Sequence, residues 1–274
     1  MVAHKPVDVL AEDLIPIHVG RASSDFKEEM ADYVGDDTGL NISEKNPQYC
    51  EMTAHYWIWK NVKDTDYVGV CHYRRYFGMD ITEENIEPLM ADADVIMVEP
   101  SWYMDSVYAY FAKFMGAENM TILAEVMKRQ CPEYFETLEK VCDGVKFYPF
   151  NMLVCKKGLF DEYCEWMFSI LEACENIVRP APYTNARRAL AYMAEMLTGV
   201  YFLHRGMRIK SVPYYKIEDG QKVLVQHSDE ERRALATYEG LLRRELAWKV
   251  KEDRKEKFNN PAILLGLEND GIIV

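Results

Sequence analysis

The chain has 274 residues, of which 49% are hydrophobic and 12% aromatic, enough to bury a substantial core in one large domain with an appendage. Its formal net charge of −13 at pH 7 repels polyphosphate, which argues against nucleic acid as a partner. Any phosphate-bearing ligand must therefore be held by a few concentrated cations, and such a cluster stands at His72, Arg74 and Arg75.

The cysteines and the apolar runs indicate the compartment. Seven cysteines are scattered along the chain and never spaced as Cys-x-x-Cys, which argues against a disulfide framework and a structural zinc site. Residues 1–6 lack the apolar core of a signal peptide, and no stretch approaches the roughly 18–20 apolar residues of a membrane span. We therefore expect a soluble cytoplasmic protein.

Short apolar runs alternate with longer helical patterns, which is typical of an α/β domain with a mostly parallel, Rossmann-like sheet flanked by helices. Residues 14–46 are rich in turn-forming residues and predict a long loop. Asn46 is the expected N-cap of the helix that follows, with Pro47 in its first turn. The expected strands are residues 1–3, 67–71, 94–98, 150–155 and 208–212. The expected helices are residues 46–62, 82–91, 121–143, 157 onward and 184–198.

We expect this α/β domain to cover residues 1–220 and a helical extension to cover residues 221–274. A capping box at Ser228 opens a charged helix that runs to about Lys257. Residues 243–257 carry seven Lys or Arg against four Asp or Glu. The same helix has an apolar stripe, which predicts docking on the domain or on a second copy of the chain: Leu235, Tyr238, Leu242 and Leu246. The alternative is that this helix contacts anionic lipid.

A polar motif, His72-Tyr73-Arg74-Arg75-Tyr76, directly follows the buried run Tyr67–Cys71. In open α/β sheets, ligands bind beyond the carboxyl ends of the strands. A histidine and two arginines in that place can neutralise a diphosphate through charge-assisted hydrogen bonds. The alternative is that the arginines pair with acidic neighbours at a sheet edge.

Two groups of amides and cations are further candidates for ligand binding. Asn41 and Lys45 lie in the loop before the helix at Asn46, whose N-terminus favours anions, although ordinary turn chemistry also accounts for such residues. Asn151 at the start of a buried strand is unfavourable unless its amide is used, either by a sugar hydroxyl or by neighbouring backbone.

The helix expected from residue 184 places Arg188, Tyr192 and Glu195 on one face. Glu195 is a candidate general base for an acceptor hydroxyl, and Arg188 a candidate phosphate ligand. The alternative is a solvated face that carries a helical ion pair.

Two carboxylate patterns predict structure rather than metal binding. Asp64-x-Asp66 and Asp92-x-Asp94 match a pattern that chelates Mg²⁺ or Mn²⁺, but each precedes its strand and so lies at the wrong end of the sheet. Glu51 and His55 stand four residues apart without a zinc-protease pattern, which predicts an internal hydrogen bond between them.

The last sequence feature is a set of segments that together span about residues 2–215: residues 41–46, 49–61, 66–77, 132–134, 150–152 and 160–166. These segments resemble one bacterial family, which occurs in capsule and exopolysaccharide gene clusters. The family was long named only as a domain of unknown function and is grouped with A-type glycosyltransferases. The chain departs from it at residues 109–113, where the family often carries histidines, so the acceptor is expected to differ.

The resemblance implies an A-type glycosyltransferase that transfers a sugar from a UDP-sugar to a growing cell-surface glycan or lipid-linked saccharide. The sugar is expected to be a hexose, with galactofuranose one candidate. The motif at His72 stands where other A-type transferases carry a metal-binding Asp-x-Asp. Cations are therefore expected to replace the divalent Mg or Mn, and no metal ligands are assigned.

The roles that follow from this resemblance divide among three groups of residues. The donor nucleotide and its diphosphate are assigned to His4, Lys5, Asn41, Lys45, Arg74, Arg75 and Arg188. The sugar is assigned to Asn151 and Tyr73, and catalysis to Glu195 and His72. The alternative function is a non-catalytic sugar-nucleotide or glycan-binding subunit of a polysaccharide assembly complex. We also expect a peripheral position at the inner face of the plasma membrane, and a homo-oligomer remains open.

Overall fold

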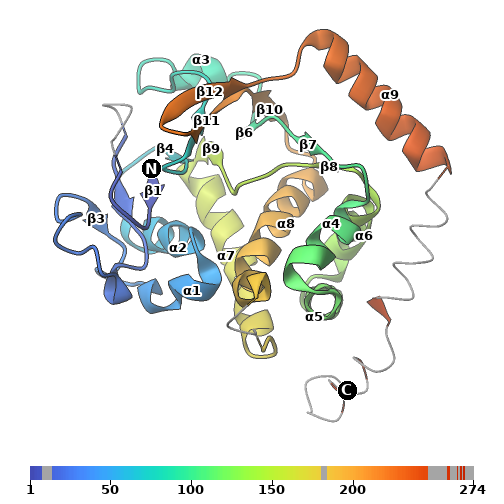
Figure 1. Cartoon of the computed structure of the whole chain (residues 1–274), viewed down its shortest axis with the longest axis horizontal. Helices are drawn as coiled ribbons and strands as arrows, with labels where there is room; N and C mark the ends of the chain where they lie inside the picture. Colours follow the sequence, from blue (N-terminus) through green and yellow to red (C-terminus); the bar gives the residue numbers. More distant parts are fainter. Residues whose placement is uncertain are drawn as a thin grey trace. The chain divides into compact units, whose positions relative to one another are not determined.

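The computed structural model describes residues 1–7, 14–179, 184–245, 258–259, 264, 266 and 268, and for residues 242–245 the backbone alone. These residues form two compact units that alternate along the sequence. Figure 1 shows the helices and strands coloured in chain order. The first unit comprises Met1–Pro100, Tyr148–Trp166 and Arg205–His227, and the second comprises Ser101–Phe147, Met167–His204 and Ser228–Val274. The domain boundary expected at residue 220 stays a prediction.

The first unit contains a row of short parallel strands. Strands β1 (Val2–Ala3), β2 (Ile17–His18) and β3 (Val34–Gly35) pair in parallel in that order. On its other side β1 bonds to the residues that follow β4 (Tyr67–Val70). The amide of Val2 donates to the Cys71 carbonyl at 2.8 Å, and the amide of Tyr73 donates to the Val2 carbonyl at 2.9 Å.

The row continues beyond β4. Strand β9 (Leu153–Lys156) lies antiparallel between β4 and β6 (Val95–Val98), and β10 (Ile209–Val212) pairs in parallel with β6. Among the described strands of this row, only β9 runs against the others, so the prediction of a mostly parallel sheet is confirmed. All four residues of β6 are at most 1% exposed, as a strand covered on both faces requires.

Strand β9 begins later than the sequence predicts. The apolar run predicts a strand from Phe150, but Phe150 has φ 78° and Asn151 has φ 53°, both in the left-handed region. An extended strand needs negative φ, so the chain can pair with its neighbours only from Leu153 onward.

A smaller antiparallel sheet completes the first unit. Its order is β12 (Gln221–Val225), β11 (Tyr214–Glu218) and β5 (Arg75–Phe77). Asp219 (φ 49°) and Gly220 (φ 76°) form the two-residue turn between β11 and β12, in which both central residues need positive φ. The sequence does not predict β12, because its side chains are mostly exposed and lack a clear apolar alternation.

The helix predicted from Asn46 is divided into α1 (Asn46–Tyr49) and α2 (Met52–Asn61). The division occurs at Cys50, whose φ of 49° is incompatible with a continuous helix. Asn46 is not an N-cap, so that prediction is wrong. Its side-chain amide donates instead to the Cys50 carbonyl at 2.8 Å and to Thr53 Oγ1 at 3.2 Å, which joins the two helices.

The other helices follow the sequence pattern with shifted ends. The helix expected from residue 184 begins at Ala189, after the 3-10 turn Asn185–Arg188, and the one expected from residue 121 is interrupted at Cys131 before Pro132. No helix within the described part of the chain is long and apolar enough to cross a membrane. The remaining elements are α3 (Ile86–Met90), β7 (Ser101–Trp102), α4 (Val107–Met115), α5 (Ala117–Gln130), α6 (Pro132–Asp143), β8 (Lys146–Phe147), α7 (Lys157–Glu175), α8 (Ala189–His204) and α9 (Asp229–Glu245).

Candidate active site

The carboxyl ends of four parallel strands meet at one edge of the first unit. His4 and Lys5 follow β1, Arg21 follows β2, Asp36 follows β3, and the motif that begins at His72 follows β4. Ligands of open α/β sheets bind at this edge. We therefore take it as the candidate active site.

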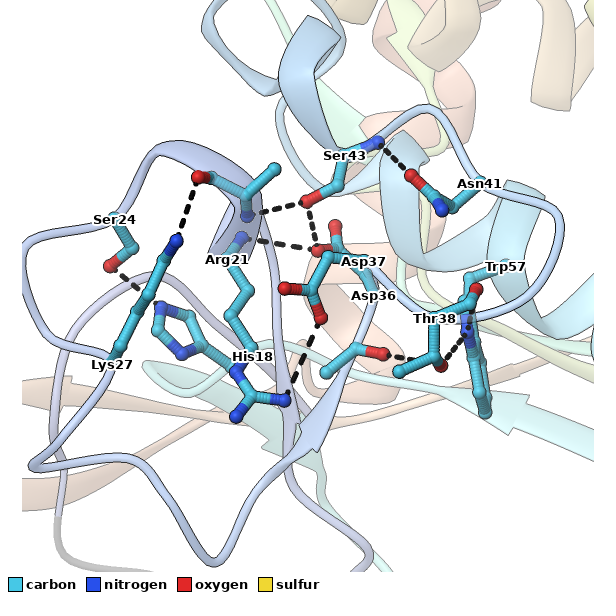
Figure 2. Close-up of polar contacts among 12 residues, drawn as sticks. His18, Arg21, Ser24, Lys27, Asp36, Asp37, Thr38, Asn41, Ser43 and Trp57 are labelled. Carbon is cyan, nitrogen blue, oxygen red and sulfur yellow. Dashed lines mark hydrogen bonds and ion pairs between the residues drawn. The ribbon is translucent and has the colours of Figure 1, made fainter.

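A buried carboxylate joins the loops that follow β2 and β3 (Figure 2). Asp36 is fully buried, and it accepts hydrogen bonds from the amide of Gly20 at 2.9 Å, from the amide of Arg21 at 3.1 Å and from the Ser43 hydroxyl. Ser43 in turn accepts from the amide of Ala22 at 3.1 Å. Three donors replace the lost hydration of the carboxylate, which is what allows its burial. The sequence indicated only a turn at Asp36.

Several polar atoms of this loop network have no hydrogen-bond partner within the described ranges. His18 is fully buried; its Nε2 lies 2.8 Å from the Ser24 hydroxyl, but its Nδ1 has no partner. Burial lowers the pKa of His18, so the ring is neutral at pH 7. Arg21 Nε also lacks a partner, although the guanidinium lies 3.6 Å from Asp37 Oδ1. The sequence analysis did not identify either of these residues as part of the site.

His72 differs from expectation in its charge. Its Nε2 lies 2.6 Å from the carbonyl oxygen of Phe150, and because a carbonyl only accepts, Nε2 carries the proton. Burial lowers the pKa of His72, and Arg75 acts in the same direction, while Glu51 opposes the shift. His72 is therefore a neutral hydrogen-bond donor at pH 7. The positive charge of the motif comes from the two arginines.

The side chains of three residues lie around the ring of Tyr73, near the end of β1. The Arg74 guanidinium lies 5.1 Å from the centre of its ring, and Lys5 Nζ lies 6.0 Å from the same centre. The His4 ring meets it edge-on at 5.2 Å. The structure thus brings together, from two distant segments, three residues that the sequence analysis assigned to the donor nucleotide and Tyr73, which it assigned to the sugar.

Asn151 uses its amide differently from either expectation. It is 1% exposed, and its Nδ2 donates to Glu51 Oε1 at 2.9 Å. His55 is fully buried, and its ring nitrogens form no hydrogen bond with Glu51, so the predicted hydrogen bond between these two residues is wrong.

Asn41 and Lys45 lie near this edge with different surroundings. Asn41 accepts from the amide of Ser43 at 3.2 Å and donates to the Gly39 carbonyl at 3.1 Å, which is the turn chemistry left open by the sequence. Lys45 is exposed, with its Nζ 6.0 Å from the ring centre of Tyr49. Lys45 is thus accessible to an anion.

Arg188 and Glu195 belong to the second unit. Arg188 ends the 3-10 turn before α8, and its guanidinium lies 5.4 Å from the ring centre of Tyr192. Glu195 is half-buried on α8. Their assignments to phosphate binding and catalysis stay predictions.

The Asp-x-Asp pair at Asp92 is structural, as expected. Both Asp94 oxygens bond to the Arg208 guanidinium, at 2.9 and 3.1 Å, and Asp92 bonds to Lys210 at 2.9 Å. These partners lower the pKa of both carboxyls. Within the described ranges, no group of three or more His, Cys, Asp or Glu residues is arranged to hold a metal ion.

The fold is that of a known class of proteins. The apo structure of WbbM, a bifunctional glycosyltransferase, matches with a TM-score of 0.69 and 27% sequence identity over 83% of this chain. The match covers 47% of WbbM, so the chain spans about half the length of that protein. The chain therefore has the mixed α/β fold of a glycosyltransferase, with a helical C-terminal region.

The family is shown by the sequence itself. A model described as domain of unknown function DUF4422 matches residues 1–206, and the chain belongs to this family. No curated protein matches the chain. Membership of a family described as a domain of unknown function is thus confirmed, whereas the expected capsule role and galactofuranose specificity stay predictions.

The buried His55 predicts a loss of stability in acid. Burial lowers its pKa to about 3, whereas an unfolded histidine has a pKa of about 6.5. Above about pH 6.5 His55 is neutral in both states and does not reduce the free energy of unfolding. As the pH falls below about 6.5, His55 is protonated in the unfolded chain but not in the folded one, and the free energy of unfolding decreases. At pH 5 the His55 contribution is a loss of about 2 kcal/mol. We measure the free energy of unfolding in urea at pH 7.5 and at pH 5. We expect the difference between the two values to be smaller in His55→Gln by that amount. Equal pH dependence in both proteins would contradict this.

Proposed function

We propose that the chain is a glycosyltransferase that takes a sugar from a UDP-sugar donor. The observation that supports this most is the gathering of cations and loop polar atoms at the carboxyl ends of four parallel strands. An anionic nucleotide fits such an edge, because the arginines there can form charge-assisted hydrogen bonds with its phosphates. Membership of the DUF4422 family and the likeness to a bifunctional glycosyltransferase support the same reaction class.

The donor is proposed to lie along this edge. Lys5 and Lys45 are exposed cations close to the loops that would hold the nucleoside, and His4 and Asn41 lie beside them. Arg74 and Arg75 would bind the diphosphate and take the place of a divalent metal. Arginine suits this role because its planar guanidinium forms paired hydrogen bonds with phosphate oxygens.

The acceptor and the chemistry form a second part of the proposal. The transferred sugar is proposed to be a hexose, with galactofuranose as a candidate, and the acceptor a growing cell-surface glycan. Glu195 would remove the proton of the acceptor hydroxyl if the reaction inverts the anomeric centre, and Arg188 would bind phosphate. Tyr73, Asn151 and His72 are proposed to shape the sugar site.

The expected test of the activity is turnover of a panel of UDP-sugars, measured as released UDP, with and without EDTA. We expect one hexose donor to be consumed and the rate to be kept in EDTA. Loss of turnover on chelation, restored by Mn²⁺ or Mg²⁺, would contradict the metal-free donor site. Calorimetric binding of UDP with no transfer to any acceptor would favour the non-catalytic binding subunit.

Arg75 provides a residue-level test of the diphosphate site. Removal of a charge-assisted hydrogen bond costs about 1.5–3 kcal/mol, so Arg75→Ala should lower kcat/KM for the donor by about 10- to 100-fold. Arg205→Ala is the matched control, because Arg205 forms a surface ion pair with Glu162 at 2.8 Å. An Arg75→Ala enzyme that keeps wild-type kcat/KM would remove Arg75 from the donor site.

The C-terminal helix is proposed to bring the enzyme to a lipid-linked acceptor at the inner face of the plasma membrane. Of the predicted stripe, Leu235 and Tyr238 are half-buried, and the Tyr238 hydroxyl lies 3.8 Å from Met104 Sδ, which supports docking within the second unit. Leu246 and most of residues 243–257 lie outside the described residues. Removal of residues 228–274 should abolish co-sedimentation with anionic liposomes. Unchanged co-sedimentation would refute the lipid contact.

A further inference from the structure

Backbone strain gathers at one place in the first unit. Among the described residues, the non-glycine residues with positive φ are Cys50, Phe150, Asn151 and Asp219. Asp219 lies in a hairpin turn that requires it. The other three meet, because Glu51 follows Cys50 and bonds to Asn151. Left-handed backbone at a bulky residue such as Phe150 persists only where the surroundings impose it, and such strain is concentrated at functional sites.

Two long-range hydrogen bonds impose this conformation. Glu51 Oε1 accepts from Asn151 Nδ2 at 2.9 Å, from a residue 100 positions away in the sequence. The Phe150 carbonyl accepts from His72 Nε2 at 2.6 Å, across 78 positions. Both left-handed residues are thus held from outside their own segment, one through its side chain and one through its backbone.

The strained turn places an aromatic ring against Arg75. The guanidinium carbon of Arg75 lies 4.1 Å from the centre of the Phe150 ring, within the range of a cation–π contact. The Tyr214 ring meets the same ring edge-on at 5.3 Å. The backbone of Arg75 is fixed as well, since its amide donates to the His72 carbonyl at 3.1 Å and its carbonyl accepts from the His72 amide at 3.0 Å.

We propose that Glu51 is a positioning residue, which holds the Phe150 ring through Asn151 and so aims the Arg75 guanidinium at an anionic ligand. The identity of that anion as a nucleoside diphosphate rests on the proposed function. Glu51 does not bind the anion, because a carboxylate repels phosphate. Its effect is transmitted by the hydrogen bond to Asn151 and by the ring contact with Arg75.

The direction in which UDP affinity changes when Glu51 is removed distinguishes a positioning role of Glu51 from an effect of its charge. If Glu51 acted by its charge alone, Glu51→Ala would tighten the binding of UDP. Positioning predicts the reverse, a Kd for UDP about 10-fold weaker by calorimetry. Glu51→Gln keeps an acceptor for Asn151 and should bind UDP at least as tightly as the wild type. Glu84→Ala is the matched control, because it removes an exposed carboxylate of the same unit. Unchanged or tighter binding by Glu51→Ala overturns the proposal.

If Glu51→Ala fails to fold, variants that exchange the carboxylate and the amide between positions 51 and 151 test the same proposal. Asn151→Asp places two acceptors against each other and should weaken UDP binding about 10-fold. The double variant Glu51→Gln/Asn151→Asp restores one donor and one acceptor with the wild-type net charge, and should recover most of the affinity. Absence of recovery in a variant that melts like the wild type overturns the proposal.

A double-mutant cycle shows whether the effect passes through Arg75. Interacting residues give non-additive changes, so Glu51→Ala should have little further effect on Kd in an Arg75→Ala background. If Glu51→Ala weakens binding in the Arg75→Ala background by the same factor as in the wild type, the effect of Glu51 does not pass through Arg75 and the proposal is overturned. Inorganic pyrophosphate is the second probe. Binding of pyrophosphate but not of UDP would refute the donor proposal while the cycle still tests Glu51, and binding of neither would refute both.

Discussion

The candidate active-site edge of the first unit depends on the buried carboxylate of Asp36. Strands β1, β2 and β3 have two residues each, so their ladders alone contribute few hydrogen bonds. Asp36 accepts from the amides of Gly20 and Arg21 and from the Ser43 hydroxyl, and so joins the loops that follow β2 and β3. Burial of a charge is tolerated only with such full pairing, and loss of any partner leaves an expensive unsatisfied group. The hydrogen bonds that allow the burial of Asp36 are therefore the same ones that join the loops proposed to hold a nucleotide.

The candidate site gathers positive charge in a chain whose net charge is strongly negative. The chain carries a formal charge of −13, yet Lys5, Arg74 and Arg75 lie around two aromatic rings at the ends of β1 and β4. An aromatic face holds a guanidinium without neutralising it, so the paired donors stay available to a phosphate. His72 serves this arrangement as a neutral donor to the Phe150 carbonyl. The motif combines two charged residues with one residue that shapes the backbone.

The fold and the family establish the architecture of the chain, whereas the reaction has to be argued from the residues of the site. The likeness to WbbM and the DUF4422 match establish the architecture and the family, while the chain corresponds to about half of WbbM. A fold hosts many activities, so the reaction must be argued from the residues at the strand ends. The cations and the aromatic rings there support the proposed anionic nucleotide donor.

Continuous apolar runs determined much of the architecture from the sequence alone. Val95–Val98 could be identified as a buried strand, and the motif after Tyr67–Val70 could be placed at a ligand-binding edge, because strand direction and side-chain burial follow from local pattern. The two-residue strands β2 and β3 could not be recognised, since they are too short to show a period.

Tertiary structure alone decided the antiparallel direction of β9, the break at Cys50, the neutral state of His72 and the use of Asn151 by Glu51. Each depends on a partner distant in the sequence: Asn151 lies 100 residues from Glu51, and Phe150 lies 78 residues from His72. Local preference disfavours left-handed φ at Phe150 and an unpaired amide at Asn151. Only the folded chain supplies the bonds that reverse those preferences, and only the folded chain provides the burial that is the main cause of the lowered pKa of His72.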